Sequence, residues 1–166
     1  MADQPFFFYP GEETIMEKKT EKSYPAAPRV GVGAIVVRDG NVLLVKRGVE
    51  PSKGLWAIPG GTLKLGETMQ ECAAREILEE TGIRINVKDC VYVFDYIEYD
   101  EDRKIKFHFA IVDFAADYVS GRPRGADDAL EARWLSAEEL QTLPVAVNTM
   151  KALRSLGFLR SDPSGA

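Results

Sequence analysis

Alternating and β-branched apolar residues predict a β-hairpin at the start of the folded part of the chain. Val30–Val37 and Val42–Val45 are rich in valine, isoleucine and leucine, as is typical of buried strands. They flank Asp39-Gly40-Asn41, a sequence that favours a tight turn between two strands.

The same criteria predict four more strands. Leu55–Ile58 predicts a short strand, which Pro59-Gly60-Gly61 ends because proline and glycine interrupt regular structure. Further along the chain, strand patterns cover Val91–Tyr99, Ile105–Phe114 and Ala132–Leu135. The first two of these are joined by the charged loop Asp100–Lys104, and Gly121–Asp128 is predicted to be a loop.

A helix is predicted over residues 68–81, because both of its ends carry signals. Thr68 and Glu71 form a T-x-x-E capping box, and Gly82 suits the left-handed residue that ends a helix. One face repeats apolar residues at i, i+3, i+4 and i+7, and we expect it to pack inward: Ala74, Ile77, Leu78 and Thr81. Helical patterns also cover 137–141, after Ser136, and 145–156.

These elements suggest one domain with an extension at each end. The predicted domain spans residues 29–157, preceded by an extension over 1–28 and followed by a tail over 158–166. Phe6–Tyr9 are four consecutive aromatic residues. They belong either to a mobile tail or to an arm that packs on a partner subunit. The start of the chain has no basic segment and no long apolar segment, and so does not match a secretory signal.

Composition excludes several classes of function. The 166 residues carry a formal net charge of −5, which disfavours nonspecific nucleic-acid binding because that usually needs a basic surface. Cys72 and Cys90 are too few and too far apart for a zinc site or a redox pair. No apolar run is long enough to cross a membrane. We expect a cytoplasmic protein without nucleic-acid or membrane partners.

Three glutamates on the predicted helix suggest metal binding. Glu76, Glu79 and Glu80 are spaced i, i+3 and i+4, and helical geometry places them about 160° from the apolar stripe. Like charges so close together repel one another, and a divalent cation such as Mg²⁺ or Mn²⁺ would turn that repulsion into binding. The alternative is a solvated acidic face without a ligand.

The glycine turn and this helix together match a longer pattern, G-x5-E-x7-R-E-U-x-E-E-x-G-U, in which U is a bulky aliphatic residue. All nine positions agree: Gly61, Glu67, Arg75, Glu76, Ile77, Glu79, Glu80, Gly82 and Ile83. The pattern is the Nudix box, and the chain resembles the MutT/Nudix hydrolases. The resemblance implies an α+β fold, an α/β/α sandwich in which helices enclose a central mixed β-sheet.

The resemblance also implies an activity and a set of metal ligands. Nudix hydrolases are Mg²⁺-dependent pyrophosphohydrolases that cleave a nucleoside diphosphate linked to another moiety X. By the family pattern, Glu76, Glu79 and Glu80 hold the metal, with the Gly60 carbonyl as a further ligand. Glu67 lies nearby, and Arg75 orients the glutamates. The alternative for Arg75 is a salt bridge to Glu79 or Glu71, and both roles can coexist.

The general base belongs either to the box or to a carboxylate in a later loop. The loop over 121–131 offers Asp127, Asp128 and Glu131, although a solvated acidic loop is the alternative. Glu131 is favoured because it adjoins the strand Ala132–Leu135.

The substrate is less determined. The patterns Pro28–Val36, Leu55–Gly61 and Ala129–Leu135 resemble bacterial ADP-ribose or ADP-sugar pyrophosphatases, although a proline that many of them carry after the box is replaced here by Glu98 and Tyr99. Nucleoside triphosphates and dinucleoside polyphosphates rank behind ADP-ribose. A non-catalytic, nucleotide-sensing module is a remote alternative, since such modules generally lose box glutamates.

Several residues outside the box are candidates for binding this nucleotide-derived substrate. Arg29, Arg47 and His108 are the first choices for phosphate or base contacts; Lys46, Arg103, Lys104 and Lys106 are further cations. Phe94, Tyr96 and Tyr99 would either stack on a base or pack in the core. By analogy with Nudix proteins of this size, we also expect a homodimer.

Overall fold

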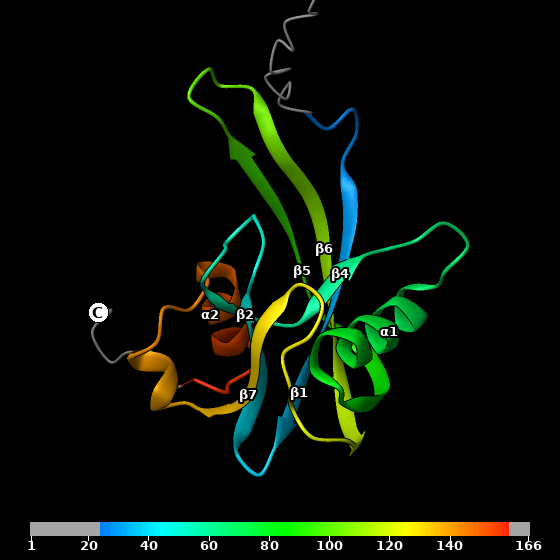
Figure 1. Cartoon of the computed structure of the whole chain (residues 1–166), viewed down its shortest axis with the longest axis vertical. Coiled ribbons are helices and arrows are strands. Elements are labelled where there is room, and N and C mark those ends of the chain that lie inside the picture. Colours follow the sequence, from blue (N-terminus) through cyan, green and yellow to red (C-terminus); the bar gives the residue numbers. More distant parts are fainter. Residues whose placement is uncertain (1–23, 160–166) are drawn as a thin grey trace, which may run out of the picture.

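The structure is a computed structural model that describes residues 24–159 (Figure 1). Its strands are β1 (Arg29–Arg38), β2 (Asn41–Arg47), β3 (Trp56–Ala57), β4 (Gly60–Thr62), β5 (Arg84–Tyr99), β6 (Ile105–Ser120) and β7 (Ala129–Ser136). Its helices are α1 (Met69–Thr81) and α2 (Val147–Ser155), with a single 3₁₀ turn, η1 (Glu139–Gln141), between β7 and α2. None of these helices is both long and apolar enough to cross a membrane.

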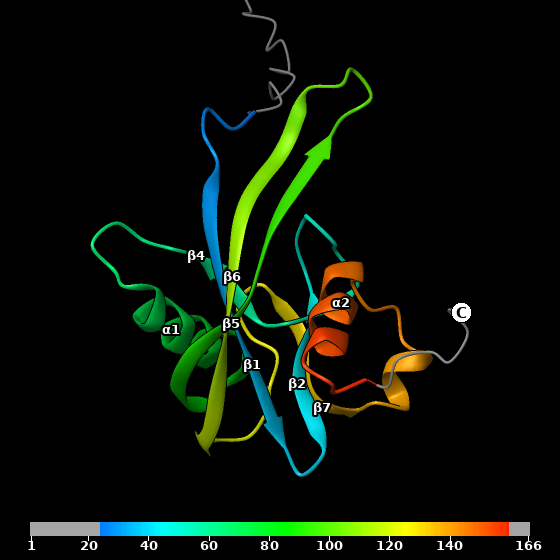
Figure 2. The ribbon, with the colours of Figure 1, turned by 180° about the vertical axis from the view of Figure 1, so that it is seen from behind.

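The strands form a mixed sheet in the order β3-β2-β1-β6-β5. Strands β1 and β6 run parallel, whereas β1 pairs antiparallel with β2 and β4, and β2 with β3 and β7. Helices α1 and α2 lie on opposite sides of this sheet, as the two opposed views show (Figures 1 and 2). The expected α+β sandwich with a central mixed sheet is therefore confirmed.

Strand β1 is buried on both faces and separates two apolar cores. Ala34 and Val36 pack in the core under α1, together with Ile77, whereas Ile35 packs on the other side with Leu153 of α2. Successive side chains of a strand point to opposite faces. An unbroken apolar run is therefore what a strand between two helical layers requires.

Strands β5 and β6 are longer than predicted. They form an antiparallel hairpin that begins at Arg84 rather than Val91 and ends at Ser120 rather than Phe114. The extra length escapes an apolar pattern because β5 is interrupted by irregular pairing between Val87 and Tyr92, which breaks the alternation of buried and exposed residues. The outer half of the hairpin projects beyond both helices (Figure 2).

Strand β4 was not expected, because glycine weakens strands in general. Here the two glycines allow close pairing: Gly60 and Gly61 lie opposite Gly33 and Val32 of β1. A Cβ atom at Gly60 would overlap the backbone carbonyl of Val32. This segment therefore pairs because it lacks side chains.

Helix α1 has the predicted ends, but only two of the four residues of its predicted packing face, Ile77 and Thr81, are buried. Thr68 and Glu71 form the capping box, and Gly82 is left-handed with φ of 71°. Leu78, however, is exposed, and the buried half of the helix contains two of the glutamates: Cys72, Ala73, Glu76, Ile77, Glu80 and Thr81. The expectation that the glutamates lie opposite the buried stripe is wrong for Glu76 and Glu80. It considered apolar residues alone, whereas these two carboxylates are buried against the β4 segment.

Candidate functional site

A cavity of about 700 Å³ lies between the β5–β6 hairpin, the loop after β2 and the first turn of α2. At one end it is lined by carboxylates: Glu76, Glu79 and Glu80 of α1, and Asp127 and Asp128 of the loop before β7. Farther along the hairpin it is lined by aromatic side chains: Phe94, Tyr96, Phe107 and Phe109. The cavity therefore offers one polar, acidic region and one flat, apolar region.

Glu80 is the most buried carboxylate of the acidic end. Its side chain accepts a hydrogen bond of 2.9 Å from the backbone N–H of Gly60, and the residue is 4% exposed. Burial raises the pKa of Glu80 to about 7, with repulsion from Glu76 and Asp128 acting in the same direction, although the Gly60 N–H and Arg47 oppose it. Glu80 therefore lies where a positive charge would be stabilised.

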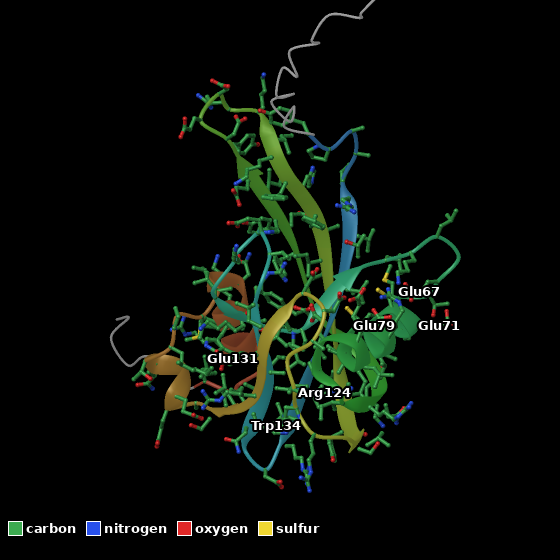
Figure 3. The ribbon with its side chains drawn as sticks, in the orientation of Figure 1. Glu67, Glu71, Glu79, Arg124, Glu131 and Trp134 are labelled. Atoms are coloured by element: carbon green, nitrogen blue, oxygen red, sulfur yellow. The ribbon has the colours of Figure 1, made fainter. Side chains whose placement is uncertain are left out.

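Arg75 holds three other carboxylates of the box. Its guanidinium donates to Glu67 at 2.6 and 2.9 Å, to Glu76 at 2.5 Å and to Glu79 at 3.0 Å. The bidentate pair keeps the pKa of Glu67 near 2. Figure 3 shows Glu67, before the start of α1, and Glu79, in its last turn, on the same side of the helix. Arg75 thus fixes the directions of these side chains. It also forms the salt bridge to Glu79 that was the alternative role expected for it.

The glycine turn makes room for the buried carboxylates. A Cβ atom at Gly61 would overlap the carboxyl group of Glu76, so a larger residue there would displace the glutamate or the strand. The absence of side chains at two successive positions brings the backbone of β4 directly against α1, and with it the Gly60 carbonyl that the family pattern makes a ligand.

The oxygen donors at this end suit a hard divalent cation. Within residues 24–159, no three side chains of the metal-binding types form a preformed cage, and Arg75 pairs with Glu67, Glu76 and Glu79. Glu76 and Glu80 nevertheless form a buried carboxylate pair beside the Gly60 backbone. Carboxylate and carbonyl oxygens are the ligands that Mg²⁺ and Mn²⁺ prefer.

The loop before β7 is tied to the C-terminal end of α1. The backbone N–H groups of Arg124 and Ala126 donate to the carbonyls of Thr81 and Glu80, at 3.0 and 3.2 Å. These bonds use carbonyls that a helix leaves free at its end. They carry Asp127 and Asp128 to the cavity, close enough for the charge of Asp128 to act on Glu80.

Glu131 is not at the cavity, which corrects the expectation that favoured it as the base. It pairs with Lys46 of the neighbouring strand at 3.4 Å, and its side chain is 48% exposed. Figure 3 shows Glu131 across β7 from Glu67 and Glu79. The reason is strand register. Glu131 is part of β7 and lies opposite Lys46 of β2, so its side chain pairs with Lys46 and does not share the position of the loop residues Asp127 and Asp128.

Two of the three candidate substrate-binding residues line the cavity, and the third does not. Arg29 and Arg47 line the cavity; Arg29 lies 5.8 Å from the centre of the Phe109 ring, and the Arg47 Nε donates to the Pro51 carbonyl at 2.7 Å. His108, in contrast, is not among the lining residues, because it alternates with Phe107 and Phe109 and points to the other face. The expectation for His108 is corrected accordingly.

Of the remaining cations, three are engaged elsewhere: Lys46 pairs with Glu131 at 3.4 Å, Lys106 pairs with Glu98 at 2.9 Å, and Lys104 lies over the Tyr24 ring. Of the aromatic candidates, Phe94 and Tyr96 line the cavity, whereas Tyr99 is exposed on the opposite face.

Asp113 is a cavity residue that sequence reasoning missed. It lies in the middle of β6 opposite Gly33, is 3% exposed, and lines the cavity. Burial raises its pKa to about 7, and within the described residues its carboxyl has no hydrogen-bond donor. The sequence signal that could have indicated Asp113 as a site residue is that it is the single acidic residue inside the apolar run Ile111–Phe114.

The chain is similar to known proteins over most of its length. Residues 27–156 match the family described as NUDIX domain. An ADP-ribose pyrophosphatase of Methanocaldococcus jannaschii is 36% identical over 131 residues, covering 78% of this chain and 75% of that protein.

Solved structures are similar as well. A MutT NUDIX hydrolase from Burkholderia pseudomallei is 32% identical with a TM-score of 0.69, covering 78% of this chain and 98% of that one. A bifunctional NMN adenylyltransferase/ADP ribose pyrophosphatase from Francisella tularensis, complexed with AMP and a Mn ion, is 27% identical with a TM-score of 0.63, covering 81% of this chain and 42% of that one.

Proposed function

Because the chain belongs to the Nudix hydrolase family, we propose that it is a Mg²⁺-dependent enzyme that hydrolyses ADP-ribose or an ADP-sugar to AMP and a sugar phosphate. The observation that supports this most is the cavity itself, which joins a buried carboxylate pair to an aromatic wall. The relative from Methanocaldococcus jannaschii carries the name ADP-ribose pyrophosphatase, which favours this substrate over others of the family.

The reaction adds water across the diphosphate. The oxygen of water bonds to one phosphorus, the bond from that phosphorus to the bridging oxygen breaks, and the two phosphates separate as AMP and sugar phosphate. A bound divalent cation supplies charge neutralisation to the diphosphate oxygens. The role of this protein's own residues is to hold that cation and the substrate, and to take a proton from the attacking water.

Glu76 and Glu80 are the proposed primary ligands, with the Gly60 carbonyl. Both are buried, which fixes their positions, and the Gly60 N–H holds one oxygen of Glu80 while its other oxygen stays available. Glu79 and Glu67 complete the set from the more exposed side, where Arg75 orients them. Mn²⁺ is an alternative cation, because it accepts the same oxygen ligands.

Asp128 is the proposed general base, in place of Glu131. It lines the cavity on the side of Glu80, and its loop is anchored to α1 by the Ala126 hydrogen bond. A base must reach the water that attacks at the cation, and Glu131 does not line the cavity. Asp127 is its neighbour on the same wall.

The aromatic wall is the proposed place for the base of the nucleotide. Phe109 lies four residues from Asp113 on the same face of β6, about 13 Å at the usual rise of a strand. A nucleotide can therefore lie along β6 with its base at Phe109 and its phosphates toward the acidic end of the cavity. Arg29, which lies over Phe109, and Arg47, near Glu80, are placed to meet the phosphates or the ring.

A substrate panel tests this proposal. The purified protein is incubated with Mg²⁺ and ADP-ribose, ADP-glucose, NADH, diadenosine polyphosphates, and ordinary and oxidised nucleoside triphosphates, and the products are separated by chromatography. We expect the highest kcat/KM for ADP-ribose or an ADP-sugar, with AMP as a product, and no turnover in EDTA. A preference for 8-oxo-dGTP would replace the substrate assignment. Tight binding without hydrolysis of any compound would contradict the enzymatic function.

A further inference from the structure

The face of the β5–β6 hairpin that turns away from the cavity exposes several apolar side chains, with Asp95 between two of them, and no described element covers it. Val93, Ile97, Tyr99 and Ile105 are 62%, 44%, 57% and 40% exposed. We call these four residues the outer hairpin face. Val93 and Ile97 alternate with the cavity-lining Phe94 and Tyr96 along β5. A register shift after Glu98 pairs Tyr99 with Ile105 across the hairpin, so Ile105 joins this face although it lies two residues before Phe107.

Neither helix covers this face. The core beneath α1 reaches only as far along the hairpin as Val112, which lies opposite Val93. Beyond that point the hairpin extends past both helices (Figures 1 and 2). Clusters of exposed apolar residues on a single surface usually have a partner.

The first described residue, Tyr24, lies at the outer end of this hairpin. The Tyr24 hydroxyl donates to Asp100 in the hairpin turn at 2.5 Å, and the Lys104 amino group lies 5.4 Å from the centre of the Tyr24 ring. Residues 1–23 therefore join the described part of the chain at Tyr24, beside the hairpin turn. They include Phe6, Phe7, Phe8 and Tyr9, followed by a charged stretch over 12–22.

We propose that the aromatic segment Phe6–Tyr9 packs on the outer hairpin face of its own chain. The fifteen residues from Tyr9 to Tyr24 can reach about 50 Å, whereas the face from Val93 to Tyr99 is roughly 20 Å long, so the segment reaches all of it. Four aromatic side chains match an apolar surface of this length. The charged stretch between them and Tyr24 suits a connection that runs through solvent. His108, opposite Ile97, lies on the same face and adds a ring against which aromatic residues can pack.

Hydrogen exchange measures whether this face is covered. The full chain is compared with a variant in which Phe6, Phe7, Phe8 and Tyr9 are all replaced by serine, which keeps the length of the extension. We expect amides of residues 93–105 to exchange roughly tenfold faster in the variant, while those of α2 are unchanged. The matched control replaces Glu12, Glu13, Lys18 and Lys19 by glutamine and should leave exchange unaltered. Equal exchange in the full chain and the serine variant would overturn the proposal.

Disulfide trapping identifies the chain that supplies the segment. Phe8→Cys is combined with Ile97→Cys in a Cys90→Ser background and oxidised at low protein concentration. We expect a bond within one chain, and none when Val37→Cys, an equally exposed position distant from the hairpin tip, replaces Ile97→Cys. A bond between two chains would replace the proposal with a swapped arm in a dimer. The absence of any bond, together with unchanged exchange, would leave the face to a foreign partner and contradict the proposal.

Discussion

Asp113 places an ionisable group where the fold has no compensating charge. Burial raises its pKa from 3.8 to about 7, so the folded protein keeps the proton that the unfolded chain releases. Stability from this group is complete below pH 3.8 and is lost as the pH rises through 7. The slope is about 1.4 kcal/mol of unfolding free energy for each pH unit between these values.

Asp113→Asn removes this dependence. We expect urea denaturation at pH 5 and pH 8 to show a smaller loss of stability in the variant than in the unsubstituted protein, because asparagine carries no charge to bury. The loss that remains comes from Glu80, whose pKa is also raised to about 7. Asp117→Asn, an exposed position on the same strand, is the control and should keep the original dependence. The same pH dependence in all three proteins would show that Asp113 is not a buried acid.

Asp128, in the loop before β7, and Glu131, within β7, offer a direct comparison of two carboxylates three residues apart. Asp128→Asn should lower kcat by about 100-fold or more, as the loss of a general base does, with little change in thermal stability. Glu131→Gln should leave kcat within about twofold, because it removes only an exposed pair with Lys46. The reverse order in steady-state kinetics would restore Glu131 as the base.

The sequence identified those candidate-site residues whose positions depend on local geometry, and it missed or misplaced those whose positions depend on the pairing of distant strands. The fixed spacing of the box brought Glu76, Glu80 and Arg75 together, since helical geometry alone determines which of them are neighbours. Glu131 and His108 were misplaced because their directions depend on strand register and alternation. Asp113 was missed because its importance arises only when Gly33 of another strand is found beside it.

At the scale of elements, helix α1 depends on its first turn. Thr68 accepts from the Glu71 N–H at 3.2 Å and Glu71 accepts from the Thr68 N–H at 2.8 Å. Thr68→Ala should therefore destabilise the protein by about 1 kcal/mol, lowering the melting temperature by about 2–4 °C. Thr142→Ala, whose hydroxyl donates to a carbonyl in the η1 turn, should cost less. Equal effects would show that the capping box contributes nothing specific.

The termini of α1 were predictable because capping is local. Its buried face was not, because the usual rule counts apolar residues, whereas here two carboxylates are buried with the help of the Gly60 amide and Arg75. The same limit applies to β4, which pairs through glycines that local preference counts against a strand. The elements nearest the site therefore departed most from the sequence pattern.

At the scale of the whole molecule, the family resemblance of residues 61–83 correctly implied the sandwich of helices around a mixed sheet. The strand patterns alone did not specify it, because the parallel pairing of β1 with β6 joins segments more than seventy residues apart. That pairing places the aromatic wall of the hairpin in line with the acidic end of the cavity. The homodimer stays a prediction, as does the cytoplasmic location, and Phe6–Tyr9 lie outside the described residues.

The most direct test of the central claim is the turnover of ADP-ribose by Glu80→Gln at saturating Mg²⁺. Glutamine keeps the size of the side chain and an oxygen for the Gly60 N–H, but removes the charge that would bind the cation. We expect kcat to fall by about 100-fold or more, with normal turnover in the surface control Glu101→Gln. The melting temperature of Glu80→Gln at pH 7 should not be lowered, because burial disfavours the charge that is removed. Near-normal turnover by Glu80→Gln would contradict the assignment of the metal site.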